Sequence, residues 1–163
     1  MAASKIKLGK VQDAVNDYEY GCMILTKLEN SPKQKDKQKI GGKIEKTYMQ
    51  LIDLYLQLNK QRHFQQVLTT LEQRLAGEYS YRMMNELANL LRKYQSYDLS
   101  QVYYKKALLC MKRKHKNLYL ENWETGKILI NIATVFYLQK NFPESIKYHN
   151  HAIEVLQRVL TKL

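Results

Sequence analysis

The 163-residue chain is poor in the residues that mark tight turns, with 6 glycines and 2 prolines. An all-β fold needs many such turns and is therefore disfavoured. The 2 cysteines, Cys22 and Cys110, lie far apart and form no CxxC motif, so neither a disulfide nor a zinc site has support. No apolar run approaches the roughly 20 residues of a membrane span, and the first residues lack the apolar stretch of a signal peptide. We therefore expect a cytoplasmic or nuclear protein with no membrane span.

Acidic residues are also scarce. The chain has 15 Asp and Glu against 27 Lys and Arg, a formal net charge of +12. This surplus suits an acidic partner such as nucleic acid, an anionic membrane or an acidic protein surface, and it is equally compatible with a solubilising surface. The basic clusters KQKDKQK (33–39) and KRKHK (112–116) have three open interpretations, namely solvated segments, phosphate contacts or a nuclear localisation signal.

Sequence signatures of catalysis are absent. The chain contains no Gly-rich phosphate loop, no HExxH motif and no nucleophile elbow. His149 and His151 are separated by one residue, so on a helix they point to different sides and do not form a metal pair. We expect no catalytic residues, no metal site and no cofactor, and hence a protein that is not an enzyme.

What the chain does contain is apolar residues at helical spacing, separated by short polar interruptions. Gly77 can end one such helix, and Ser80 can cap the next. Asn141, with Pro143 and Glu144 behind it, has the pattern of a capping box. We therefore predict an all-α fold of antiparallel helix pairs with short turns. The helical segments are 10–28, 44–58, 64–75, 81–94, 97–113, 125–139 and 141–160.

Small residues recur at fixed distances in the last two helix pairs. In each pair an alanine is followed after 12 residues by a serine and after 7 more by a second alanine. Small side chains let two helix backbones approach closely, while large neighbours fill the gaps. We therefore expect close helix contacts at six positions: Ala88, Ser100 and Ala107, and Ala133, Ser145 and Ala152.

This arrangement resembles the tetratricopeptide repeat, a motif of about 34 residues with small residues at its eighth, twentieth and twenty-seventh positions. The resemblance implies an α-solenoid, a right-handed superhelical array of helix pairs. It divides the chain into a partial repeat (1–29), a basic linker (30–42), a degenerate helix pair (43–77), one repeat (78–116) and another with an extended junction (117–163). Because the first segment matches only the second half of a repeat, we expect either a piece of a longer array or a partner that covers this end.

In this family the first helix of each pair lines a concave groove. The resemblance thus implies a partner-binding groove formed by Arg82, Asn85, Asn89, Arg92, Lys127, Asn131, Thr134 and Tyr137. Asparagines there can pair with the backbone amides of a bound peptide, and the basic residues would suit acidic side chains or a terminal carboxylate. We expect a non-catalytic protein-interaction scaffold that binds a peptide or helix as part of a larger protein or complex. The alternative is a basic helical-repeat module that binds RNA or DNA.

Overall fold

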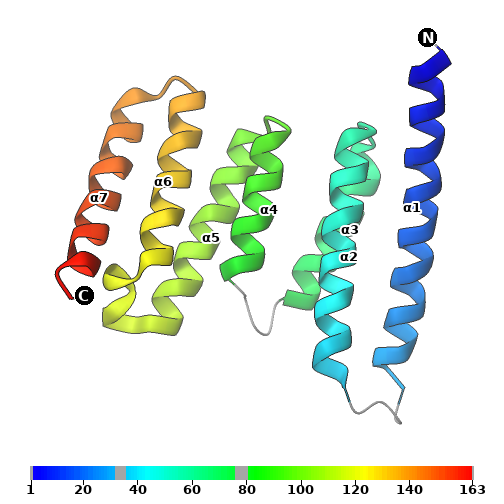
Figure 1. The fold of residues 1–163 in the computed structure, drawn as a ribbon, viewed down its shortest axis with the longest axis horizontal. Coiled ribbons are helices and arrows are strands. Elements are labelled where there is room, and N and C mark those ends of the chain that lie inside the picture. The colour runs from blue at the N-terminus through cyan, green and yellow to red at the C-terminus, as the bar shows by residue number, and fades with distance from the viewer. Residues whose placement is uncertain (1, 32–35, 76–80, 163) are drawn as a thin grey trace. The chain divides into compact units, whose positions relative to one another are not determined.

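The structure, a computed structural model, describes residues 2–31, 36–75 and 81–162. It contains two compact units, Met1–Ala76 and Gly77–Leu163. All the regular structure in the described ranges is helical, which confirms the all-α prediction (Figure 1). None of the helices in these ranges is long and apolar enough to cross a membrane.

The first unit consists of three helices, α1 (Ala2–Glu29), α2 (Lys37–Gln57) and α3 (Gln61–Leu75). Both α1 and α3 pack against α2. The side chains of Ile44, Leu51 and Ile52 on α2 are almost fully buried, together with Phe64 and Leu71 of α3. The helical pattern of residues 44–75 therefore reflects a real apolar core.

The linker predicted over residues 30–42 is shorter in the structure, because α2 begins at Lys37. Residues 32–35 lie outside the described ranges. Extending α2 to Lys37 places Ile40 in the core, where its side chain is buried. Gly41, which falls in the predicted linker, lies inside α2 and permits close packing on α1, since a Cβ atom there would lie 3.1 Å from Glu29 Oε1.

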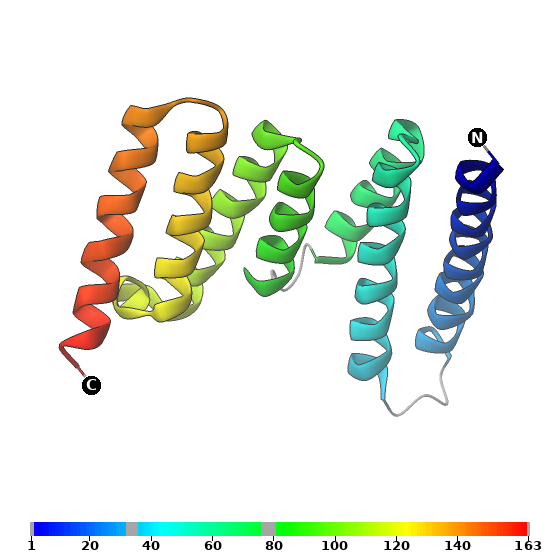
Figure 2. The same cartoon turned by 45° about the horizontal axis from the view of Figure 1, so that its top comes forward.

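The second unit contains α4 (Tyr81–Lys93), α5 (Tyr97–His115), the short 3₁₀ helix η1 (Lys116–Glu121), α6 (Trp123–Leu138) and α7 (Phe142–Leu160). Helix α4 pairs with α5 and α6 pairs with α7, in chain order (Figures 1 and 2). The extended junction that the sequence predicted before the last helix pair is formed by the end of the long helix α5 together with η1. Gly77 and Ser80, expected as a helix end and a cap, lie outside the described residues.

The six small residues that recur in these two pairs are all buried, which confirms the close contacts predicted for them. The serines also make a hydrogen bond that spacing alone does not reveal. The hydroxyl of Ser100 donates to the carbonyl of Ala88 at 2.8 Å, and that of Ser145 donates to the carbonyl of Ala133 at 2.9 Å. In both pairs, the second helix is thus joined to the first by an equivalent hydrogen bond.

The turns inside the helix pairs share one backbone conformation. Asn59, Gln95 and Lys140 each have a positive φ, between 54° and 62°. The next residue in each turn donates its N–H to a carbonyl five residues back, at 2.9 Å. This is the Schellman arrangement that satisfies carbonyls at a helix end. At the α6–α7 turn, Asn141 Oδ1 also accepts a hydrogen bond from the N–H of Glu144, which confirms the predicted cap.

Candidate functional site

Helices α4 and α6 contact each other within the second unit, so the two helix faces predicted to line a groove adjoin. The predicted residues on these faces will be called the inner strip. Its members are Arg82, Asn85, Asn89 and Arg92 on α4, and Lys127, Asn131, Thr134 and Tyr137 on α6.

Three side chains of the inner strip form a bridge between the two helices. Asn131 donates from Nδ2 to Asn85 Oδ1 at 3.2 Å, and its own Oδ1 accepts a longer hydrogen bond of 3.5 Å from Arg92 Nη1. All three residues are half-buried. The bridge therefore fixes which way the amides of Asn85 and Asn131 point.

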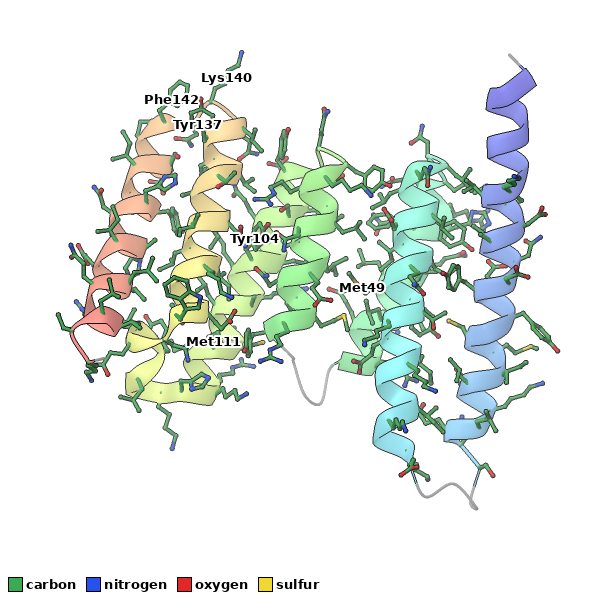
Figure 3. The ribbon with its side chains drawn as sticks, in the orientation of Figure 1. Met49, Tyr104, Met111, Tyr137, Lys140 and Phe142 are labelled. Carbon is green, nitrogen blue, oxygen red and sulfur yellow. The ribbon has the colours of Figure 1, made fainter. Side chains whose placement is uncertain are left out.

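Asn89 is oriented by a hydrogen bond from a tyrosine on another helix. The hydroxyl of Tyr104, on α5, donates to Asn89 Oδ1 at 2.6 Å. Tyr104 is fully buried, and this burial raises the pKa of its phenol, so the group remains a donor. Figure 3 shows Tyr104 between the helices of the second unit.

In these contacts, the side-chain oxygen of every asparagine in the inner strip accepts one hydrogen bond. The amide N–H groups of Asn85 and Asn89 make no hydrogen bond to another described residue, and Arg92 has only its contact with Asn131. The central part of the strip consequently offers free N–H donors beside oxygens that each already accept one hydrogen bond. An occupant that supplies carbonyl or carboxylate oxygens would match it.

The charge at the other end of the inner strip is more mixed than the sequence predicted. Lys127 Nζ lies 2.7 Å from Glu124 Oε1, so its charge is largely balanced. A hollow of about 180 Å³ opens here, and it is lined by Tyr81, Arg82, Asn85, Glu86, Glu124 and Ile128. Arg82 projects beside Tyr81, donating from Nε to the phenol oxygen at 3.1 Å. The net positive charge is therefore concentrated towards Arg92.

Two predicted members of the strip do not join its hydrogen-bond network. The hydroxyl of Thr134 donates to the carbonyl of Ile130, within its own helix. Tyr137 is exposed at the α6–α7 turn, where its ring lies edge-on to Phe142 with 5.8 Å between the ring centroids (Figure 3). Tyr137 thus belongs to a different surface from the asparagines.

The structure also contains a shallow apolar groove in the first unit that sequence reasoning did not identify. It has a volume of about 420 Å³ and lies against α1, α2 and α3, with Met23, Leu51 and Val67 among its lining residues. Cys22 borders it, and burial raises the pKa of this thiol to about 11, which makes it a poor nucleophile. Across the described ranges, no group of three His, Cys, Asp or Glu side chains is arranged to hold a metal ion.

Comparison with known proteins yields a structural similarity. No protein-family model matches the chain, and no curated protein matches it. The crystal structure of BtubC (BKLC) from P. vanneervenii superposes with a TM-score of 0.65 at 17% sequence identity, covering 91% of this chain. The chain spans 58% of the length of that protein. At this identity the similarity shows a common fold and carries no functional information.

Proposed function

We propose that the chain is a non-catalytic protein-interaction scaffold built of tetratricopeptide-like repeats that wind into a right-handed superhelix. The equivalent turns and the equivalent serine–carbonyl hydrogen bonds of the helix pairs support the repeat interpretation. Repeat arrays of this kind hold partners on extended surfaces formed by successive helix pairs. The inner strip on α4 and α6 is the surface we assign to partner binding.

The observation that carries this proposal is the set of free N–H donors on the asparagines, whose oxygens each already accept one hydrogen bond. Because Tyr104, Asn131 and Arg92 each already donate one hydrogen bond to these oxygens, the strip retains more free donors than free acceptors. An extended segment with backbone carbonyls and acidic side chains supplies such acceptors. The proposed partner is therefore an acidic, extended stretch of another protein.

A displayed library of random peptides tests this proposal, followed by fluorescence anisotropy with the enriched peptides. We expect enrichment of Asp and Glu. The variant Asn89→Asp keeps an oxygen for Tyr104 but removes the free N–H donors and adds a negative charge. It should weaken binding of the acidic peptides at least about tenfold, since hydrogen bonds to charged groups contribute about 1.5–3 kcal/mol.

Asn16→Asp is the matched control, because Asn16 is exposed on α1, outside the inner strip. This variant should bind the peptides as the parent does, and both variants should melt within a few degrees of it. Peptides without acidic enrichment, or binding that is unaffected by Asn89→Asp, would contradict the proposal.

Nucleic-acid binding is a second candidate because of one stretch of the second unit. Residues 99–120 contain six Lys and Arg and no acidic residue. Lys105, Lys112 and Arg113 are exposed on α5, and none of them forms an ion pair with another described residue. Phosphates could contact this surface without involving the inner strip.

A further inference from the structure

Helix α7 has two apolar faces, and only one of them is covered in the structure. Ser145, Ala152 and Val155 are buried against the rest of the second unit. On a separate face, Phe142, Ile146, Ile153 and Leu160 are between 51% and 63% exposed. These four residues will be called the α7 stripe. Their spacing of four, seven and seven residues keeps them in line along five turns of the helix.

The exposed apolar surface extends from α7 onto the neighbouring helix. Tyr137 of α6 is 60% exposed and its ring lies against Phe142 at the α6–α7 turn (Figure 3). Ile130 and Trp123 precede it at intervals of seven residues on α6, and both are exposed. Soluble monomers rarely expose so many large apolar side chains on adjacent elements unless the surface binds something.

The area of this surface is sufficient for a specific interface between two copies. Tyr137 and the four residues of the α7 stripe are each more than half exposed. An interface that covered all of them in both copies would approach the lower limit of a typical stable interface, roughly 1,200 Å². The burial of this much apolar surface is the main favourable contribution expected.

The distribution of charge favours a second copy as the occupant. The chain carries a net charge of +12, so most of its surface repels another copy of itself. The α7 stripe contains no charged residue, and the helix positions that border it hold residues without a formal charge at pH 7, with Asn150 and Gln157 on one side and His149 and Leu156 on the other. Two such stripes can meet without placing like charges in contact.

We propose that two copies of this chain associate through their α7 stripes, with the two α7 helices antiparallel. Alignment of the stripes about residue 151 places Phe142 of one copy opposite Leu160 of the second copy. It also brings Lys147 towards Glu154 of the second copy, whereas a parallel arrangement would place these two residues on opposite sides of the interface. The antiparallel pair is therefore the arrangement with the better charge match. It gives an isologous, two-fold interface.

Sedimentation equilibrium over micromolar to submillimolar protein concentrations tests this association. We expect a monomer–dimer equilibrium, and Ile146→Glu and Ile153→Glu should each raise its dissociation constant about a hundredfold or more. Both side chains are exposed, so circular dichroism should show unchanged helicity. Leu109→Glu, a change at a similarly exposed position on α5, should leave the equilibrium unaltered. A parent that remains monomeric throughout, or a dimer that persists in both stripe variants, would overturn the proposal.

Cysteine crosslinking tests the antiparallel arrangement, using two positions on the same border of the stripe. Asn150 lies one residue from the proposed centre, so the two Asn150 residues are offset by about 3 Å along the helices. Gln157 lies six residues from the centre, which gives an offset of about 18 Å. A short bismaleimide should crosslink Asn150→Cys but not Gln157→Cys, while the native Cys22 and Cys110 are buried. Crosslinking of both variants would indicate parallel helices, and crosslinking of neither in a dimer would indicate another surface.

Discussion

The three turns within helix pairs place non-glycine residues in a backbone conformation that favours glycine. Asn59, Gln95 and Lys140 all have a left-handed φ, and only the first is a residue type that tolerates it well. For other L-residues the contact between Cβ and the backbone costs about 1–2 kcal/mol. Each turn therefore retains strain that a change at a single residue could remove.

Replacement of Lys140 by glycine should relieve this strain and stabilise the protein. Lys140 is exposed at the α6–α7 turn, so little packing is lost (Figure 3). We expect Lys140→Gly to raise the free energy of unfolding by about 0.5–1 kcal/mol, as measured by urea unfolding followed by circular dichroism.

Gln157→Gly provides the opposite control, because Gln157 is an exposed residue inside α7. Glycine in a helix interior should lower the free energy of unfolding by about 1 kcal/mol. If both variants destabilise the protein equally, then the left-handed conformation at Lys140 is not strained.

At the scale of the helices, the sequence predicted the pairs and their contacts because these depend on local patterns. Apolar spacing identifies each helix, and small residues such as Ala88 and Ser100 mark where two helices meet. Gly41 shows where such patterns fail. A glycine beside another glycine suggests a break, but here its lack of a side chain serves packing on Glu29 of another helix. That distinction requires the tertiary structure.

Enlarging a small residue at a helix contact should disrupt the packing. Ala107 and Ala152 are essentially inaccessible to solvent, and Ala152 lies in a cluster with Leu129 and Val155. Leucine at either position should lower the free energy of unfolding by about 1–3 kcal/mol through overpacking. Thermal unfolding followed by circular dichroism measures this effect.

Val102→Leu is a suitable control because Val102 is a similarly apolar but exposed residue on α5. It should melt within a degree or two of the parent. Leucine variants at Ala107 and Ala152 that melt with the parent as well would show that these contacts are loosely packed.

The inner strip was predictable in its location but not in its chemistry. Repeat spacing alone places Asn85, Asn89 and Asn131 on adjoining faces. It does not reveal that Tyr104 donates to the oxygen of Asn89, because this contact depends on how side chains of different helices meet. The pairing of Lys127 with Glu124, three residues earlier on the same helix, is visible in the sequence spacing but was not predicted. Sequence therefore indicates a polar, positive surface, and the structure shows that its centre offers donors.

For the molecule as a whole, the salt dependence of nucleic-acid binding tests directly whether the large positive charge serves to bind phosphates. If α5 contacts phosphates, anisotropy with a fluorescent RNA or DNA oligonucleotide should show affinity falling by orders of magnitude over a few-fold increase in salt. Replacing Lys105 and Lys112 by glutamate should then reduce the slope, whereas Asn89→Asp should have little effect. If no oligonucleotide binds at low salt, this second candidate function is wrong.

Burial of several weak acids should make the protein sensitive to alkaline pH. Burial raises the pKa of Cys22 from 9.0 to about 11, and it also raises the pKa values of Cys110, Tyr55 and Tyr104 above their ordinary values. These groups release protons more readily when unfolded, so their contribution to stability is fully present below about pH 9 and is lost as the pH rises through the folded values.

Urea unfolding at pH 7, 9 and 10.5 measures this sensitivity. We expect the free energy of unfolding to be similar at the first two values and clearly lower at the third. Cys22→Ala should show a shallower decline, since the thiol with the pKa of about 11 is then missing. A decline of equal slope in the variant would assign the effect to other groups, such as the lysines.

The shared geometry of the turns makes the helix pairs exchangeable along the chain. Gln95 and Lys140 have nearly the same backbone conformation and are followed by equivalent helices, α5 and α7. If residues 96–140 were cut out and the ends rejoined, Gln95 would lead directly into α7. Ser145 would then stand twelve residues after Ala88, where Ser100 stands now, and Ala152 would take the place of Ala107. Arrays of this type can therefore be lengthened or shortened by whole pairs, with each serine still donating to an alanine carbonyl twelve residues before it.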